Sequence, residues 1–314
     1  MLIMQHDKRR PRQKTPTASS DFVPQSVRIK HCAAESQVSI QPYFVLVAAS
    51  ALLGAPAMVS TVPAQEGYDI ATDRPVTLSL AKAAILELRG GVGSITVSRS
   101  SGPSTIVTAK RVTPGAEPRV QLVKHEKGIT ICSVYESGNP RKPNECLPMR
   151  KGRRFEGLKK DSPAVHFEVQ LPDGVDLMAD TATGNVTTTA LTGNVSISVF
   201  RGNIAVIDGG SPDIRTNVMA GDTDATLGAF GGNGTRHLSF TATGGMLKVR
   251  IPANVPIDYW ISSGMSIETP FQLHKTVGEV SSGHLGPPGS TISLRIDAGS
   301  LLAKVALLPA PAQR

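Results

Sequence analysis

Cys132 and Cys146 are the residues of this chain whose types and spacing most plainly allow chemistry. They are fourteen positions apart and enclose a stretch rich in Gly, Pro and Asn. Two thiols at this spacing in an oxidising compartment favour a disulfide that closes a loop. Zinc is the alternative, but it needs two further ligands, and no His or Cys stands at a suitable spacing. We therefore predict a Cys132–Cys146 disulfide and no metal site.

Acidic and basic residues at alternate positions are the nearest approach to a catalytic group. Asp213 precedes Arg215 by two positions, and Asp222 precedes Asp224 by two, so each pair would share one face of a strand. Some β-solenoid enzymes cleave polysaccharide with such an arrangement, and a polysaccharide-active enzyme is therefore one alternative. Calcium is another, but the regular Gly and Asp spacing of calcium-binding repeats is missing.

Motifs of known catalytic sites are missing from the sequence. It has no nucleophile elbow, no zinc-protease motif, no phosphate-binding loop and no paired-cysteine metal site. The histidines after residue 64 are isolated from one another: His125, His166, His237, His274 and His284. We therefore predict no catalytic residue, no cofactor and no small-molecule substrate.

A basic segment interrupts the chain between residues 139 and 162. Its eight Lys and Arg stand against three acids, and its single aromatic residue is Phe155, so stacking on single-stranded nucleic acid is poorly supported. We predict either a solvated loop or a contact with an anionic surface polymer or phospholipid head groups. The residues of this contact would be Arg141, Lys142, Arg150, Lys151, Arg153, Arg154, Lys159 and Lys160.

One long apolar run, residues 43–59, follows Arg28 and Lys30 and leads to small residues that end at Ala64. This order is typical of a secretory signal with cleavage after Ala64, so that the exported part starts at Gln65. An uncleaved membrane anchor is the alternative, although about 17 residues broken by Gly and Pro are at the short limit for spanning a bilayer. Both interpretations place the remainder in the periplasm, outside the cell or in the cell envelope.

The composition favours β structure. The chain has 30 Gly and 23 Pro among its 314 residues, with 18% charged and 4% aromatic residues, which is poor material for helices. The net charge of +8 divides about evenly between residues 1–64 and the remainder. It therefore predicts solubility and gives no indication of a nucleic-acid partner.

Short alternating segments between residues 75 and 108, and again from Ala164, predict half-buried strands. A short unit of Thr-Gly-Asn-Val type then repeats, with its first three glycines nine residues apart. Such a unit cannot bury its own apolar face, so neighbouring units must stack. We predict an all-β fold, a β-solenoid-like stack of short strands whose turns are made at Gly184, Gly193, Gly202, Gly221 and Gly244.

These residues resemble a known family, the "putative adhesin" β-strand-repeat domains of unknown function in exported bacterial proteins. The similarity rests on residues 167–177, the Thr-Gly-Asn-Val units, residues 244–253 and residues 292–300. It implies a β-solenoid-like fold and an envelope location, and it implies no catalytic residue. The long basic segment departs from the family's pattern.

The chain thus divides into six parts. They are an unstructured basic extension (1–42), a signal peptide or anchor (43–64), N-terminal strands (65–138), the basic loop (139–162), a β-repeat domain (163–305) and a tail (306–314). The leading hypothesis is an exported, non-enzymatic, adhesin-like structural or interaction module whose partner is an envelope protein or polymer. An accessory of envelope stress or assembly is a further alternative.

Overall fold

The computed structural model describes the chain from Gly67 onward, with gaps. The described residues are 67–112, 118–137, 144–148, 158, 161–228, 234–252, 255–264, 266–272, 280–286, 289, 292–298 and 302–309, without the side chains of 208 and 302–308. The chain separates into two units, Met1–Ser60 and Thr61–Arg314. All described residues belong to the second unit. The predicted extension and signal segment, and two thirds of the basic loop 139–162, lie outside them.

Strands make up the regular structure of the described residues, and the prediction of an all-β fold is confirmed. Sheet A contains, in spatial order, β1 (Gly67–Asp69), β6 (Arg119–His125), β7 (Gly128–Val134), β3 (Ile85–Val92), β9 (Asp176–Thr183), β11 (Val195–Arg201), β13 (Asp213–Ala220), β15 (Arg236–Ala242), β20 (Ile292–Ala298), β17 (Ile257–Ser263) and β19 (Val280–Leu285). Sheet B contains β18 (Ile267–Glu268), β21 (Leu302–Pro309), β16 (Gly244–Ile251), β14 (Thr223–Leu227), β12 (Ile204–Gly209), β10 (Val186–Thr189), β4 (Ile95–Arg99), β8 (Val165–Leu171), β5 (Thr105–Arg111) and β2 (Pro75–Leu78).

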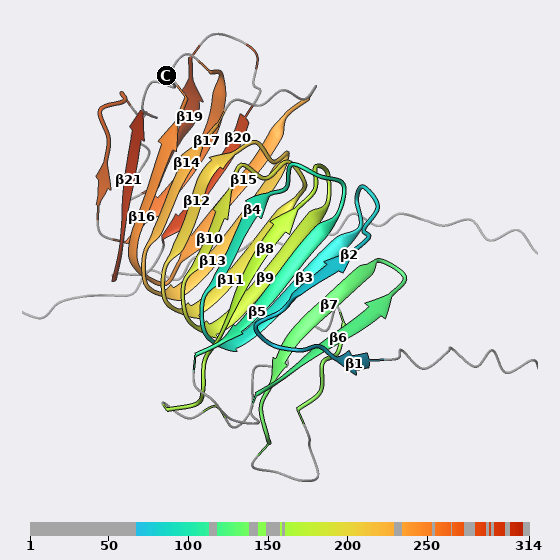
Figure 1. Ribbon diagram of the computed structural model, residues 1–314. Coiled ribbons are helices and arrows are strands. Elements are labelled where there is room, and N and C mark those ends of the chain that lie inside the picture. The colour runs from blue at the N-terminus through green and yellow to red at the C-terminus, as the bar shows by residue number, and fades with distance from the viewer. Residues whose placement is uncertain are drawn as a thin grey trace, which may run out of the picture. The chain divides into compact units, whose positions relative to one another are not determined.

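The chain alternates between the two sheets, and each coil contributes one strand to each. In sheet A, Val195 of β11 pairs in parallel with Leu177 of β9 and with Ile214 of β13. In sheet B, Ile204 of β12 pairs in parallel with Val186 and Thr223. Successive coils therefore lie side by side in both sheets at once (Figure 1).

The order of the coils departs from a simple stack at both ends. The β3–β4 coil lies between β7–β8 and β9–β10, although it comes first in the chain. At the other end, the β20–β21 coil lies between β15–β16 and β17–β18. The segments expected as N-terminal strands and as the repeat domain thus share both sheets. Residues 306–309, expected as the start of a tail, belong to β21.

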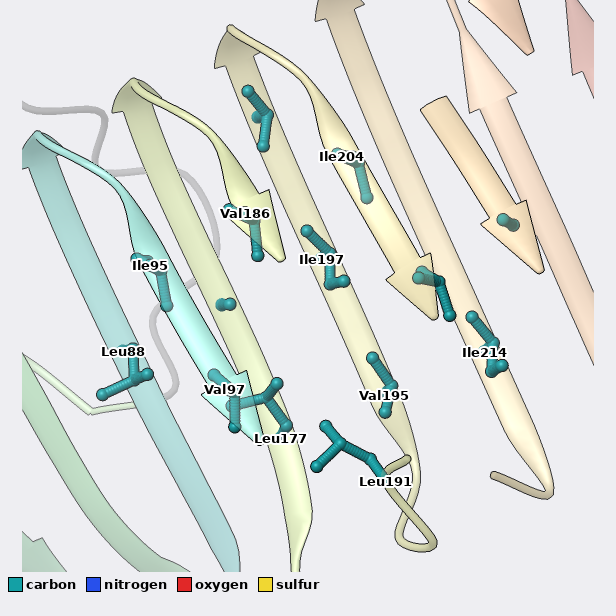
Figure 2. Close-up of a cluster of buried hydrophobic side chains, with 14 of the residues drawn as sticks. Leu88, Ile95, Val97, Leu177, Val186, Leu191, Val195, Ile197, Ile204 and Ile214 are labelled. Carbon is teal, nitrogen blue, oxygen red and sulfur yellow. The ribbon is translucent and has the colours of Figure 1, made fainter. Parts of the chain in front are cut away.

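The core lies between the two sheets. Strands alternate between a buried and a more exposed side chain, as in β8, where Val165, Phe167, Val169 and Leu171 are buried. Figure 2 shows such side chains from both sheets, among them Leu88, Leu177 and Ile197 of sheet A and Ile95 and Ile204 of sheet B. Each buried aliphatic side chain contributes roughly 1.5–3 kcal/mol. Because no helix of the described residues covers the sheets, the alternate side chains of most strands are the polar outer faces.

Glycines make the turns from sheet A to sheet B. Gly184, Gly202, Gly221 and Gly245 have φ values of +149°, +138°, +142° and +102°. A Cβ on any of the last three would lie 2.0 to 2.1 Å from the carbonyl oxygen of the glycine one coil earlier. Gly244 and Gly245 are the first two residues of β16. The positive φ and the close approach fall on Gly245, whereas we expected the turn at Gly244. Gly193 lies at the opposite edge, against the carbonyl of Val175.

Side-chain hydrogen bonds reinforce these turns. Asn203 N donates to Asn185 Oδ1 at 2.9 Å, and Asp222 N donates to Asn203 Oδ1 at 2.9 Å. Met246 N donates to Asp222 Oδ1 at 2.8 Å in the next coil. The first two steps span 18 and 19 residues and the last spans 24. The coil that ends at Gly245 is longer, which moves the glycine out of the expected position.

Candidate functional site

The disulfide lies on the outer face of sheet A. Cys132 of β7 is bonded to Cys146, as predicted. Both cysteines are buried and pack against Val123 of β6 and Val134 of β7. A loop of this size contributes about 3 kcal/mol in the chain-entropy model. The bond therefore holds the described residues 144–148 against β6 and β7.

Tyr135 fixes the two ends of the basic segment to β3. Its hydroxyl accepts a hydrogen bond from Val92 N at 3.0 Å and donates one to Pro163 O at 2.9 Å. Its ring lies on Gly91, where a Cβ would come within 2.3 Å of the ring. Burial raises the pKa of the Tyr135 hydroxyl. Gly90 and Gly91 lie inside β3, and Gly91 provides the strand position without a side chain that the Tyr135 ring occupies.

The basic segment replaces a short turn. Four coils pass from sheet A to sheet B through the glycine turns described above, whereas β7 ends at Val134 and β8 begins only at Val165. Three points hold this long connection: Tyr135 before it, Pro163 after it and Cys146 within it. The eight basic residues predicted as an anionic contact flank Cys146 in the sequence and lie outside the described residues.

A buried polar network lies on the outer side of sheet A, on the face that carries the disulfide. Glu87 of β3 is 2% exposed and accepts hydrogen bonds from Arg89 Nε at 2.7 Å and from the Thr130 hydroxyl at 2.6 Å. His125 Nε2 lies 3.2 Å from Thr130 Oγ1. Since the single hydroxyl proton of Thr130 goes to Glu87, His125 Nε2 carries the proton in the second bond. Burial lowers the pKa of His125, while Glu87 acts in the opposite direction.

A cleft opens beside this network, between the turn that precedes β3 and the turn that joins β6 to β7. Its volume is about 580 Å³, which is within the range of ligand sites. Residues 79–85 line one side and residues 124–129 the other, with His125, Lys82, Lys124 and Lys127 among them. Sequence reasoning missed this cleft, because 42 positions separate Lys82 from Lys124 and no motif joins them.

The acidic residues considered for catalysis do not come together. Asp213 and Arg215 form an ion pair at 2.6 Å on the outer face of sheet A. Asp222 takes part in the hydrogen bonds that connect the glycine turns of successive coils. Asp224 contacts Arg250 on the outer face of sheet B. The core separates the two pairs, so they cannot form one groove. The described residues also contain no group of three His, Cys, Asp or Glu side chains that could hold a metal ion.

The described histidines remain apart from one another as well. His166 Nδ1 accepts a hydrogen bond from Ser94 N at 3.0 Å, and His284 contacts Asp258 at 2.8 Å. His274 lies outside the described residues. Within the described part of the chain, no helix is long and apolar enough to cross a bilayer.

The two adjacent aromatic residues of β17 point to opposite faces. Tyr259 is 3% exposed in the core. Trp260 is on the outer face, and the Arg295 guanidinium lies 4.1 Å from the centroid of its ring. This cation–π contact covers part of the ring face that a sugar would need.

Comparisons with known proteins give structural resemblances only. No protein-family profile and no curated protein match the sequence. A "putative cell adhesion protein" from Clostridium sporogenes has a TM-score of 0.46 and 9% identity over 75% of this chain and 99% of that chain. "Putative adhesins" from Bacteroides fragilis and Parabacteroides distasonis have TM-scores of 0.27 and 0.21, with 12% and 13% identity, and cover 75% and 74% of this chain and 98% and 96% of their own.

Proposed function

We propose that this chain is an exported, non-enzymatic, adhesin-like interaction module of the cell envelope that presents its basic segment to an anionic polymer or protein. The observation that carries the proposal is the three-point attachment of this segment. Tyr135 and Pro163 are joined at its ends, and Cys146 is bonded to β7. A rigid base lowers the entropy lost on binding, because the presenting strands are already ordered.

Two further observations support the proposal. A buried disulfide is typical of proteins that fold in an oxidising compartment, which agrees with export. The acidic residues that would be needed for polysaccharide cleavage lie on different faces. The outer faces carry Ser, Thr and paired charges, a surface suited to broad contact.

The binding test replaces the eight basic residues of the segment with Ser in the full chain. We expect binding to an anionic envelope-polymer preparation to fall by at least about tenfold, because these charges provide the long-range attraction. A control variant with eight exposed Lys and Arg replaced outside residues 139–162 should retain more of the binding. Equal binding by the wild type and the eight-site variant would remove the segment from the proposal.

Export has its own test. We expect the protein recovered from the cell envelope to begin at Gln65, because small residues that end at Ala64 follow the apolar run. N-terminal sequencing measures this directly. Recovery of the chain only from the cytoplasm would contradict the proposed location.

A further inference from the structure

Three lysines of the cleft between residues 79–85 and 124–129 form no direct ion pair, although Asp173 interacts with Lys82 at longer range. Lys82 belongs to the turn before β3, Lys124 to the end of β6 and Lys127 to the β6–β7 turn. Among the residues that the structure describes, none of their ammonium groups forms an ion pair, whereas Lys110 and Lys248 both have carboxylate partners. Glu126 is the only acid of the lining. Like charges around one concavity repel one another, and a bound anion relieves this repulsion.

The chemistry of the lining suits a phosphate group that is bound by lysines. No arginine lines the cleft, so it has no planar fork for bidentate binding of a carboxylate or a phosphate. Lysines act as point charges that can approach a tetrahedral oxyanion from several directions. The volume of about 580 Å³ exceeds the need of one oxyanion, which leaves room for the polyol or sugar that carries it.

The neighbouring surface favours a soluble ligand over a membrane. The large exposed apolar residues of the described chain are Tyr68, Val112, Phe200, Ile207 and Met219. None of them lines the cleft. The lining of the cleft therefore offers no large exposed apolar side chain that could insert into a bilayer next to a bound lipid head group.

We propose that this cleft binds a phosphate ester of a soluble polyol or sugar chain, with Lys82, Lys124 and Lys127 as its cationic groups. The site is independent of the basic segment and of export. His125 adds a pH-dependent contribution. Its Nε2–H is directed to Thr130, so protonation would add the new proton and the positive charge at Nδ1.

The charged groups around His125 come from each element near it. Lys124, Glu126 and Lys127 share its hairpin, Lys82 lies across the cleft, and Glu87 with Arg89 lies behind Thr130. Burial is the largest influence on the pKa of His125 and lowers it. The additional charge is therefore expected only below the ordinary value of 6.5.

Calorimetric titration of the full chain with glycerol phosphate oligomers tests the proposal. The variant K82S/K124S/K127S should bind at least about tenfold more weakly, because the attraction is electrostatic. The control R74S/R119S/R201S removes the same charge elsewhere and should stay within about twofold of the wild type. Equal losses in both variants, or no binding by the wild type, would overturn the site.

Three further arms separate the remaining alternatives. The eight-site variant of the basic segment should still bind the oligomers, so a failure of the cleft is distinguishable from a failure of the proposed function. Lysine-dependent binding to phosphatidylglycerol vesicles without binding to the oligomers would overturn the soluble ligand. Sulfate keeps the same charge between pH 5 and 8, so any change in its affinity over this range reports on the protein. The affinity for sulfate should rise below about pH 6.5 in the wild type but not in H125Q. Identical pH profiles would remove His125 from the site.

Discussion

At the scale of single residues, Arg236 is a buried cation held by backbone carbonyls. It is 1% exposed, and its guanidinium donates to Ser211 O at 3.0 Å, to Gly228 O at 3.2 Å and to Gly209 O. Gly209 is the last residue of β12, Ser211 follows this strand, and Gly228 follows β14, at the edge where the chain returns to sheet A. Burial lowers the pKa of Arg236 to about 10, so the group stays charged at neutral pH.

We predict that R236M destabilises the protein by about 4 kcal/mol. Methionine fills much of the same volume, but it leaves three buried carbonyl groups without a donor. Urea denaturation measures the free energy of unfolding. R74M is the control, because Arg74 is exposed, and its loss should cost no more than about 0.5 kcal/mol. Similar losses for the two variants would show that the three carbonyl contacts contribute little.

His125 predicts a pH dependence of stability. Its folded-state pKa lies below the ordinary value of 6.5 because burial disfavours the charged ring. The unfolded chain therefore takes up the proton first, and the stability that is present above pH 6.5 is lost as the pH falls below it. Thermal unfolding between pH 7.5 and 5 should show this loss in the wild type and a smaller one in H125Q. An equal loss in both proteins would contradict the assignment.

At the scale of elements, the glycine turns tolerate fewer residue types than the strands do. Gly202 combines a φ of +138° with a carbonyl oxygen 2.0 Å from where a Cβ would lie. We predict that G202A costs about 3 kcal/mol or more, because both the backbone conformation and the spacing of the coils must change. Chemical denaturation measures this loss of unfolding free energy. G102A should be nearly neutral, since its Cβ would meet nothing closer than 3.9 Å, and equal effects would contradict the steric argument.

At the scale of the whole molecule, local features could be predicted from the sequence and long-range order could not. The alternation of apolar residues and the nine-residue glycine spacing predicted the strands and three of the turns. The interleaving of coils has no local signal, because β17 and β20 have the same alternation and either could pair with β15. The disulfide could be predicted because its two cysteines are close in the sequence. The cleft could not, because it depends on the pairing of β3 with β7, which are distant in the sequence.

The interleaving itself can be tested by shortening the chain after Gly289. This truncation removes β20 and β21, which leaves β17 two strand spacings, about 9.6 Å, from β15. We predict that the backbone amides of β17 and β19 then exchange with solvent as in an unfolded segment, while β9, β11 and β13 stay protected, because each coil depends mainly on its neighbours. Hydrogen exchange read by mass spectrometry measures both regions. A chain that ends at Pro309 keeps every described strand and should exchange like the wild type. Retained protection of β17 in the shorter chain would mean that β17 can pair directly with β15, and the order of coils would then be a preference of the C-terminal strands rather than a requirement of the fold.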